Sequence, residues 1–204
     1  MPLTCPLDFD VATLRKEVQT IYSRVAYAPD GEFHFHRGPV FAAARLGYDA
    51  TEMAELPPSV TSSFAGIGNP HAIGRIPAGA TVLDIGCGAG MDLLLAAKRV
   101  GPEGRAIGVD MTEAMRSRAV AGAAECGLRN VEVLAGDATR LPVATGSIDV
   151  VISNGVLNLV PEKKLAIAEM ARVLKPGGRV QIADIIIGEV LSDDALRHID
   201  LWTG

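Results

Sequence analysis

The 204-residue sequence has little of what marks secreted, membrane-spanning or nucleic-acid-binding proteins. Its three cysteines, Cys5, Cys87 and Cys126, make neither a paired framework nor a C-x-x-C motif, so a reduced, cytoplasmic setting is the default expectation. No signal peptide is visible at the N-terminus, and no apolar run is long enough to span a bilayer. Basic residues number 19 against 24 acidic ones, without any basic stretch, which argues against nucleic acid as the main partner.

What the sequence does have is apolar material, 49% of its residues against 21% charged, enough for a full core in one domain with an elaboration. We expect residues 1–75 to form a helical N-terminal segment that serves as a lid on the substrate side. Apolar residues recur there at helical spacing from Asp10 onward. Two shorter helices are predicted around 40–46 and 50–56, and residues 63–70 are predicted to form a glycine-rich loop.

Residues 76–204 alternate between short apolar stretches and amphipathic ones, which is typical of a doubly wound, mostly parallel α/β sheet. The predicted strands are 81–85, 105–109, 131–134, 148–152 and 180–187. The predicted helices between them are 92–100, 113–126 and 161–174, the last with a core face of Ile167, Met170, Ala171 and Leu174. A further helix is predicted near Ser192. No later strands follow it to complete such a sheet, so we expect a C-terminally truncated domain.

One motif stands out, Asp84-Ile85-Gly86-Cys87-Gly88-Ala89-Gly90, at the end of the first of these strands. A strand, a tight glycine turn and a helix form the place where open α/β sheets bind nucleotide-like ligands. The glycines let the backbone approach a ligand closely, and the first turn of the helix offers free N–H groups to an anion. Met91 stands where the dinucleotide fingerprint G-x-G-x-x-G requires its third glycine, so the spacing disfavours NAD.

Polar residues also follow the other strands. Asp110 and Met111 follow the second strand, where the carboxylate is suited to accept hydrogen bonds from both ribose hydroxyls. Asp137 and Ala138 follow the third, where the carboxylate is suited to accept from an adenine amino group. Asn154, which offers both a donor and an acceptor, follows the fourth and is expected to face the reacting group.

Each of these polar residues also has a simpler interpretation. Asp110 is placed to cap the next helix, although Thr112 fills that position and leaves the ribose role favoured. Asp137 is equally suited to capping a turn, and Asn154 to bonding its own backbone. The agreement of four strand ends is what favours a nucleotide-like ligand.

The D-x-G-x-G-x-G motif resembles motif I of class I S-adenosylmethionine (SAM) methyltransferases, and the likeness covers about 80–187. The segments 63–70, 109–112, 152–161, 172–178 and 201–204 resemble arsenite methyltransferases more closely. The resemblance implies a Rossmann-like fold, methyl transfer from SAM to a small-molecule acceptor, and an N-terminal segment over the active site. It also implies the cofactor residues, which are Asp84, Gly86, Gly88, Gly90, Asp110, Met111, Asp137, Ala138 and Asn154.

The sequence departs from the arsenite methyltransferases at Gly155, where that family has one of its arsenic-binding cysteines. A soft ion needs two or three converging thiolates, and the sequence does not assemble them from its cysteines. The acceptor therefore stays open between arsenite and another small metabolite, such as a quinone-like acceptor of C-methylation. A non-catalytic SAM-binding module and an NAD-type oxidoreductase are the rival classes.

A general base, if the reaction needs one, is expected in the lid. The candidates are His34, His36, Tyr22 and Tyr27, with Asn154 as a further polar residue at the reaction centre. If Phe33–His36 is extended, both histidines point one way and both phenylalanines the other. No third ligand stands near the two histidines, so no metal site is predicted. The sequence gives no oligomeric state.

Overall fold

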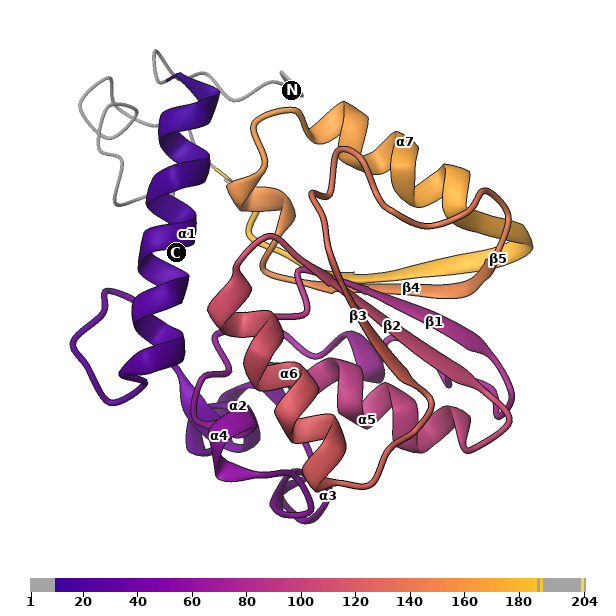
Figure 1. The fold of residues 1–204 in the computed structure, drawn as a ribbon, viewed down its shortest axis with the longest axis horizontal. Coiled ribbons are helices and arrows are strands. Elements are labelled where there is room, and N and C mark those ends of the chain that lie inside the picture. Colours follow the sequence, from indigo (N-terminus) through magenta and orange to yellow (C-terminus); the bar gives the residue numbers. More distant parts are fainter. Residues whose placement is uncertain (1–9, 187, 189–202, 204) are drawn as a thin grey trace.

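The computed structural model describes residues 10–186, 188 and 203, which form a layered α/β arrangement (Figure 1). Parallel strands make one sheet in the order β3-β2-β1-β4-β5. Their bounds are Thr81–Ile85 for β1, Arg105–Asp110 for β2, Val131–Ala135 for β3, Ile148–Asn154 for β4 and Leu174–Ala183 for β5. The predicted doubly wound sheet is confirmed, and β1 lies between β2 and β4, so the strand order reverses beside the glycine motif.

Helices cover both faces of this sheet (Figure 1). Helices α5 (Met91–Val100) and α6 (Glu113–Glu125) lie on one face, and α7 (Lys163–Val173) lies on the other. Because both faces are covered, the central strands are mostly apolar, as at Val82, Leu83 and Ile85, all buried. A short 3-10 turn, η2 (Leu157–Leu159), connects β4 to α7.

The N-terminal part adds one long helix and several short ones around the ends of α5 and α6. They are α1 (Val11–Tyr27), α2 (Gly38–Leu46), α3 (Ala50–Ala54), α4 (Pro58–Thr61) and the 3-10 turn η1 (Pro70–Ala72). The Asp10 side chain accepts a hydrogen bond from the Thr13 N–H and caps α1. Helix α1 packs against α6 near the strand ends, while α3 and α4 pack against α5 and α6 through an apolar cluster that includes Met53, Val60 and Phe64.

Two predictions about α7 and β5 are wrong. Strand β5 begins at Leu174 rather than at 180, because Leu174 already pairs with Ile148 of β4 and residues 175–178 lie at a register shift between this pair and the next. The buried face of α7 consists of Ala166, Met170 and Val173, whereas Ile167 is 46% exposed. Met170 is buried as predicted, but the buried face is turned away from Ile167 and Ala171, both exposed.

Other local predictions also differ from the structure. The sequence analysis missed α4 and η1, which are too short to carry a periodic pattern. Residues 33–36 are not a strand, yet Phe33 and Phe35 pack inward and both histidines are exposed, as the alternation predicted. The helix near Ser192 and the missing later strands lie outside the described residues. No helix within 10–186 has the length and apolar character needed to cross a membrane.

Candidate active site

A cavity lies at the carboxyl ends of β1, β2 and β4, with side chains of α1 and of 60–66 on its far side. The space between its walls is about 1080 Å³, part of it open to solvent. The predicted cofactor residues that line it are Asp84, Gly86, Gly88, Asp110, Met111, Asp137, Ala138 and Asn154. Gly90 does not line it but caps the start of α5.

The glycine turn between β1 and α5 needs glycine for two different reasons. Gly86 has a φ of 69°, and a Cβ there would lie 2.4 Å from Cγ2 of Val156, so the turn is pressed against the loop after β4. Gly88 has a φ of 53° and nothing within 4 Å of its Cβ position. Backbone at Gly88 is therefore open to the cavity, and a ligand can come close to it.

Asp84 places an unpaired carboxylate oxygen in the cavity wall. The side chain is buried, and its Oδ2 has no hydrogen-bond partner among the described residues. Burial raises the pKa of the Asp84 carboxyl well above its usual range, and the neighbouring Asp92 and Asp110 carboxylates raise it further. A cationic ligand group would give the Asp84 oxygen a partner and would lower the raised pKa. The wall therefore fits the ammonium and sulfonium of SAM.

Asp110 joins the end of β2 to the glycine turn. Its Oδ2 accepts a hydrogen bond from the Gly88 N–H at 2.9 Å, and its Oδ1 accepts one from the Thr112 N–H at 2.7 Å. Burial raises the pKa of the Asp110 carboxyl, although these two bonds oppose the rise. The Thr112 hydroxyl makes no capping hydrogen bond to α6, so the sequence argument that Thr112 frees Asp110 from a local role is wrong. The ribose role stays a prediction.

Asp137, at the end of β3, has protein partners on both carboxylate oxygens. Oδ1 accepts hydrogen bonds from the Thr139 N–H at 2.7 Å and hydroxyl at 2.6 Å, which is the turn-capping arrangement. Oδ2 pairs with Nε of Arg15 of α1 at 3.1 Å. The same arginine donates to Glu162 at 3.3 Å, so α1 is tied across the cavity mouth. The adenine contact of Asp137 stays a prediction.

Asn154, at the end of β4, lines the cavity, but its amide is hydrogen-bonded to other parts of the protein. Oδ1 accepts hydrogen bonds from the N–H groups of Ile67 and Gly68 at 2.9 and 3.2 Å. Nδ2 donates to the Gly68 carbonyl, the Tyr48 hydroxyl and Asp92 Oδ2 at 2.8, 3.1 and 3.0 Å. These bonds favour a structural role over the catalytic candidacy that the sequence suggested.

The proposed bases in the lid are mostly away from the cavity. His34 and His36 are exposed, and neither lines the cavity. His34 packs edge-on against Phe35, and His36 stacks on Phe41. Tyr27 is 79% exposed. Tyr22 does line the cavity, where burial raises the pKa of its phenol and the Asp110 and Asp184 carboxylates add to the rise. Tyr22 therefore stays protonated at neutral pH.

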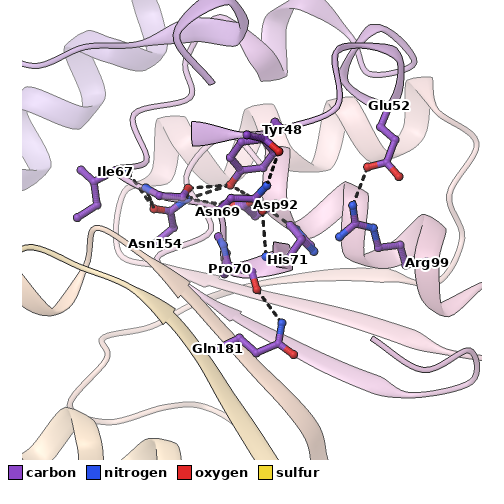
Figure 2. Close-up of polar contacts among 12 residues, drawn as sticks. Tyr48, Glu52, Ile67, Asn69, Pro70, His71, Asp92, Arg99, Asn154 and Gln181 are labelled. Carbon is purple, nitrogen blue, oxygen red and sulfur yellow. Dashed lines mark hydrogen bonds and ion pairs between the residues drawn. The ribbon is translucent and has the colours of Figure 1, made fainter. Parts of the chain in front are cut away.

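The sequence analysis missed a buried polar cluster beside the cavity, formed by Tyr48, His71 and Asp92 (Figure 2). The Tyr48 hydroxyl donates to Asp92 Oδ1 at 2.7 Å. Nε2 of His71 lies 3.2 Å from the same oxygen, an ion-pair distance without hydrogen-bond geometry. The one available signal was an aspartate in the first turn of the helix after the glycine motif, a common position for a solvated acid.

Comparisons with known proteins agree with this geometry. Residues 76–200 match the family model described as a methyltransferase domain. The chain is 46% identical over 160 residues to an arsenite methyltransferase of Halobacterium salinarum, covering 78% of this chain and 41% of that protein. It is 37% identical over 110 residues to a demethylmenaquinone methyltransferase of Listeria monocytogenes, covering 54% of this chain and 46% of that protein.

A solved structure is also similar, an arsenic(III) S-adenosylmethionine methyltransferase from Chlamydomonas reinhardtii. It is 35% identical, has a TM-score of 0.63, and the match covers 71% of this chain and 51% of that one. The chain thus spans about half or less of the length of these relatives. It belongs to the methyltransferase domain family, with a Rossmann-like fold and SAM as cofactor.

Proposed function

We propose that this member of the methyltransferase domain family binds SAM at the ends of β1, β2 and β3 and transfers its methyl group to a small-molecule acceptor. The observation that carries the proposal is the unpaired Oδ2 of buried Asp84, in the same cavity as the open backbone at Gly88. When bound, the cofactor supplies an electrophilic methyl group on a sulfonium.

Each part of the cavity wall suits one part of the cofactor. Asp84 would hold the ammonium side. The first N–H groups of α5 would hold the carboxylate, since the Gly88 N–H in the turn already bonds to Asp110. Asp110 would accept from the ribose hydroxyls. Met111 and Ala138, which also line the cavity, would flank the base.

The remaining wall would hold the acceptor and exclude water. It is apolar, with Val60, Phe64, Leu159 and Val160 among its residues. Tyr22 with its raised pKa would act there as a hydrogen-bond donor rather than a base. Holding the acceptor in line with the methyl carbon is then the main contribution of the protein. We infer the same substrate-side role for the whole segment 1–75, against a SAM-binding domain at 76–204, in a cytoplasmic protein.

The first candidate for the acceptor is arsenite, and the similarity to the two arsenic methyltransferases supports it. A second candidate is a neutral, quinone-like acceptor. Among the residues that line the cavity, Cys87 is the sole cysteine, and burial, with the Asp110 and Asp84 carboxylates, raises the pKa of its thiol. A neutral buried thiol is a poor ligand for a soft ion that prefers two or three thiolates.

Calorimetric titration with SAM and S-adenosylhomocysteine, with NAD as control, tests the proposal. Micromolar binding of either SAM species but not NAD is the expected result. Methyl transfer from labelled SAM to arsenite with thiols, or to a reduced quinone, then separates the two acceptor classes. Binding without transfer to any acceptor would indicate a non-catalytic SAM-binding module, and binding of NAD alone would overturn the proposal.

A further inference from the structure

Asp92, in the first turn of α5, is a buried carboxylate held by residues from three separate segments (Figure 2). Tyr48 lies between α2 and α3, His71 lies in η1, and Asn154 ends β4. All three approach the Asp92 oxygens to within 3.2 Å. Burying a carboxylate without partners costs several kcal/mol, so these contacts are what allow Asp92 to lie there. They also fix the three segments relative to the start of α5.

Asn154 extends this connection to residues 63–72, which we call the roof segment. The Asn154 amide oxygen accepts from the N–H groups of Ile67 and Gly68, and its amide nitrogen donates to the Gly68 carbonyl. A second buried amide, Gln181 of β5, donates to the Pro70 carbonyl at 2.7 Å. Irregular chain leaves backbone groups without a ladder partner, and here buried side chains of the sheet supply the partners.

The roof segment lies directly on the sheet ends. A Cβ at Gly66 would lie 2.3 Å from Nδ2 of Asn154, and a Cβ at Gly68 would lie 2.6 Å from Cβ of Ala183. Phe64, Ala65 and Gly66 meanwhile line the cavity. The position of this cavity wall is therefore set by contacts with β4, β5 and Asp92.

We propose that Tyr48, Asp92 and Asn154 form a positioning clamp that fixes the roof segment on the acceptor side of the cavity. The proposal rests on the proposed function, because the wall matters for catalysis only if an acceptor binds beside it. The polar groups of the clamp bond to one another and to the roof backbone, so these are positioning residues. Asp92 also lines the cavity two residues after Gly90, which links the roof to the helix start that would hold the cofactor.

Tyr48→Phe tests the clamp with the least disturbance, because it keeps the ring that packs edge-on against Phe64 and removes only the hydroxyl. Tyr27→Phe, at a 79% exposed position outside the cavity, is the matched control. The change removes the hydroxyl's contacts with Asp92, Asn154 and the Gly68 carbonyl. Amide hydrogen exchange at Ile67 and Gly68 is therefore expected to be about tenfold faster in Tyr48→Phe. Exchange in β1 and the Kd for SAM are expected to stay near the wild-type values.

A change at Asp92 tests the Asp92–Asn154 contact. Asp92→Asn keeps the size of the side chain but removes the charge that Tyr48 and Asn154 hold, so amide exchange at Ile67 and Gly68 is expected to become faster. With any acceptor that the chain methylates, this variant is expected to lower kcat and leave KM for SAM unchanged.

Three results would overturn the clamp. They are exchange in Tyr48→Phe equal to the control, acceleration in β1 as large as at Ile67, and a SAM Kd raised more than tenfold in Asp92→Asn without local exchange. The last would make Asp92 a cofactor ligand. Failure of the unaltered chain to bind SAM would overturn the proposed function instead, and the exchange comparison would still decide on the clamp.

Discussion

On the side of the cavity where β1, β2 and β3 end, the backbone shapes the wall, whereas on the side of β4 and β5 side chains hold irregular chain in place. The first side, which we call the turn side, consists of the 85–90 turn and the short loops after β2 and β3. Its backbone takes positive φ at Gly86, Gly88 and Gly90. Side chains add a few contacts: Asp110 accepts the N–H groups of Gly88 and Thr112, and Asp137 pairs with Arg15.

The second side, which we call the roof side, consists of the roof segment and residues 155–161. Besides the clamp, it uses Asp184, whose carboxylate accepts the N–H groups of Val156, Leu157 and Asn158 at 3.2, 2.7 and 3.0 Å. The Lys163 ammonium group donates to the backbone carbonyls of residues 157, 158 and 160. Chain outside a ladder must satisfy its backbone groups through side chains. The backbone conformation of the turn side is therefore set mainly by glycines, and that of the roof side mainly by polar side chains from other segments of the chain.

Asp110→Ala is expected to have the largest effect, and it acts on the turn side. The change removes an acceptor for the ribose and both backbone hydrogen bonds, so SAM affinity should fall by on the order of 1.5–3 kcal/mol. Calorimetry measures it, with the exposed Asp30→Asn as control. Unchanged affinity would remove Asp110 from the cofactor site.

Asp84→Asn is expected to weaken SAM binding by about tenfold, because a charged partner for the ammonium becomes a neutral one. The same change should raise the thermal stability of the ligand-free protein at neutral pH, since an unpaired buried charge is removed. Opposite signs for affinity and stability are the distinctive result. A loss of both would assign Asp84 to the fold alone.

The same residue predicts a pH dependence. Because the pKa of Asp84 is raised above its ordinary value of 3.8, the folded protein binds this proton more tightly than the unfolded chain. The free energy of unfolding of the ligand-free protein is therefore expected to fall as pH rises from about 4 through the raised pKa. Denaturant titrations across this range should give a shallower fall for Asp84→Asn, and parallel curves would contradict the assignment.

Gly66→Ala is expected to have an intermediate effect on the roof side. The added methyl would meet Asn154 and the Phe64 ring at 2.3 and 2.5 Å, so the free energy of unfolding should fall by roughly 1–3 kcal/mol. Gly188→Ala is a control for the loss of a glycine without crowding, since its φ is not positive and nothing lies within 4 Å there. A Gly66→Ala variant as stable as Gly188→Ala would show that the roof segment moves aside freely.

Asp184→Ala is expected to have the smallest effect, about 0.5–2 kcal/mol, comparable to the loss of a helix cap. It removes the acceptor for the N–H groups at 156–158, and Asp184→Asn, which keeps one oxygen, should retain part of the stability. Denaturant titration measures both variants. SAM affinity should change little in either, because the turn side is intact, and a large change would show that the two sides are not independent.

Much of the fold follows from local sequence. Strand β1 and the start of β2 have the predicted bounds because apolar runs between glycine turns have few other conformations in a buried sheet. The prediction fails at β5 and at the buried face of α7. There the pairing of Leu174 with Ile148 of β4 and the packing of Ala166 in the core outweigh turn propensity and apolar pattern.

The candidate site divides in the same way. Asp84, Gly88 and Asp110 come together as predicted because the carboxyl ends of parallel strands share one edge. Tyr48 and His71 were not predicted, because their partner Asp92 lies 44 and 21 positions away and no spacing rule connects them. His34 and His36 do not line the cavity for the converse reason, since alternation shows which side chains point together but not toward what.

The sequence by itself determined which segments form strands, where the glycine turn lies and which acids stand at the strand ends. These features depend on backbone dihedrals and burial periodicity, which act over a few residues. Only the tertiary structure decided which polar residues hold the roof segment, which way α7 faces and which tyrosine meets the cavity. Those outcomes depend on pairing buried donors and acceptors between segments far apart in the chain. Such pairing leaves no local pattern to read.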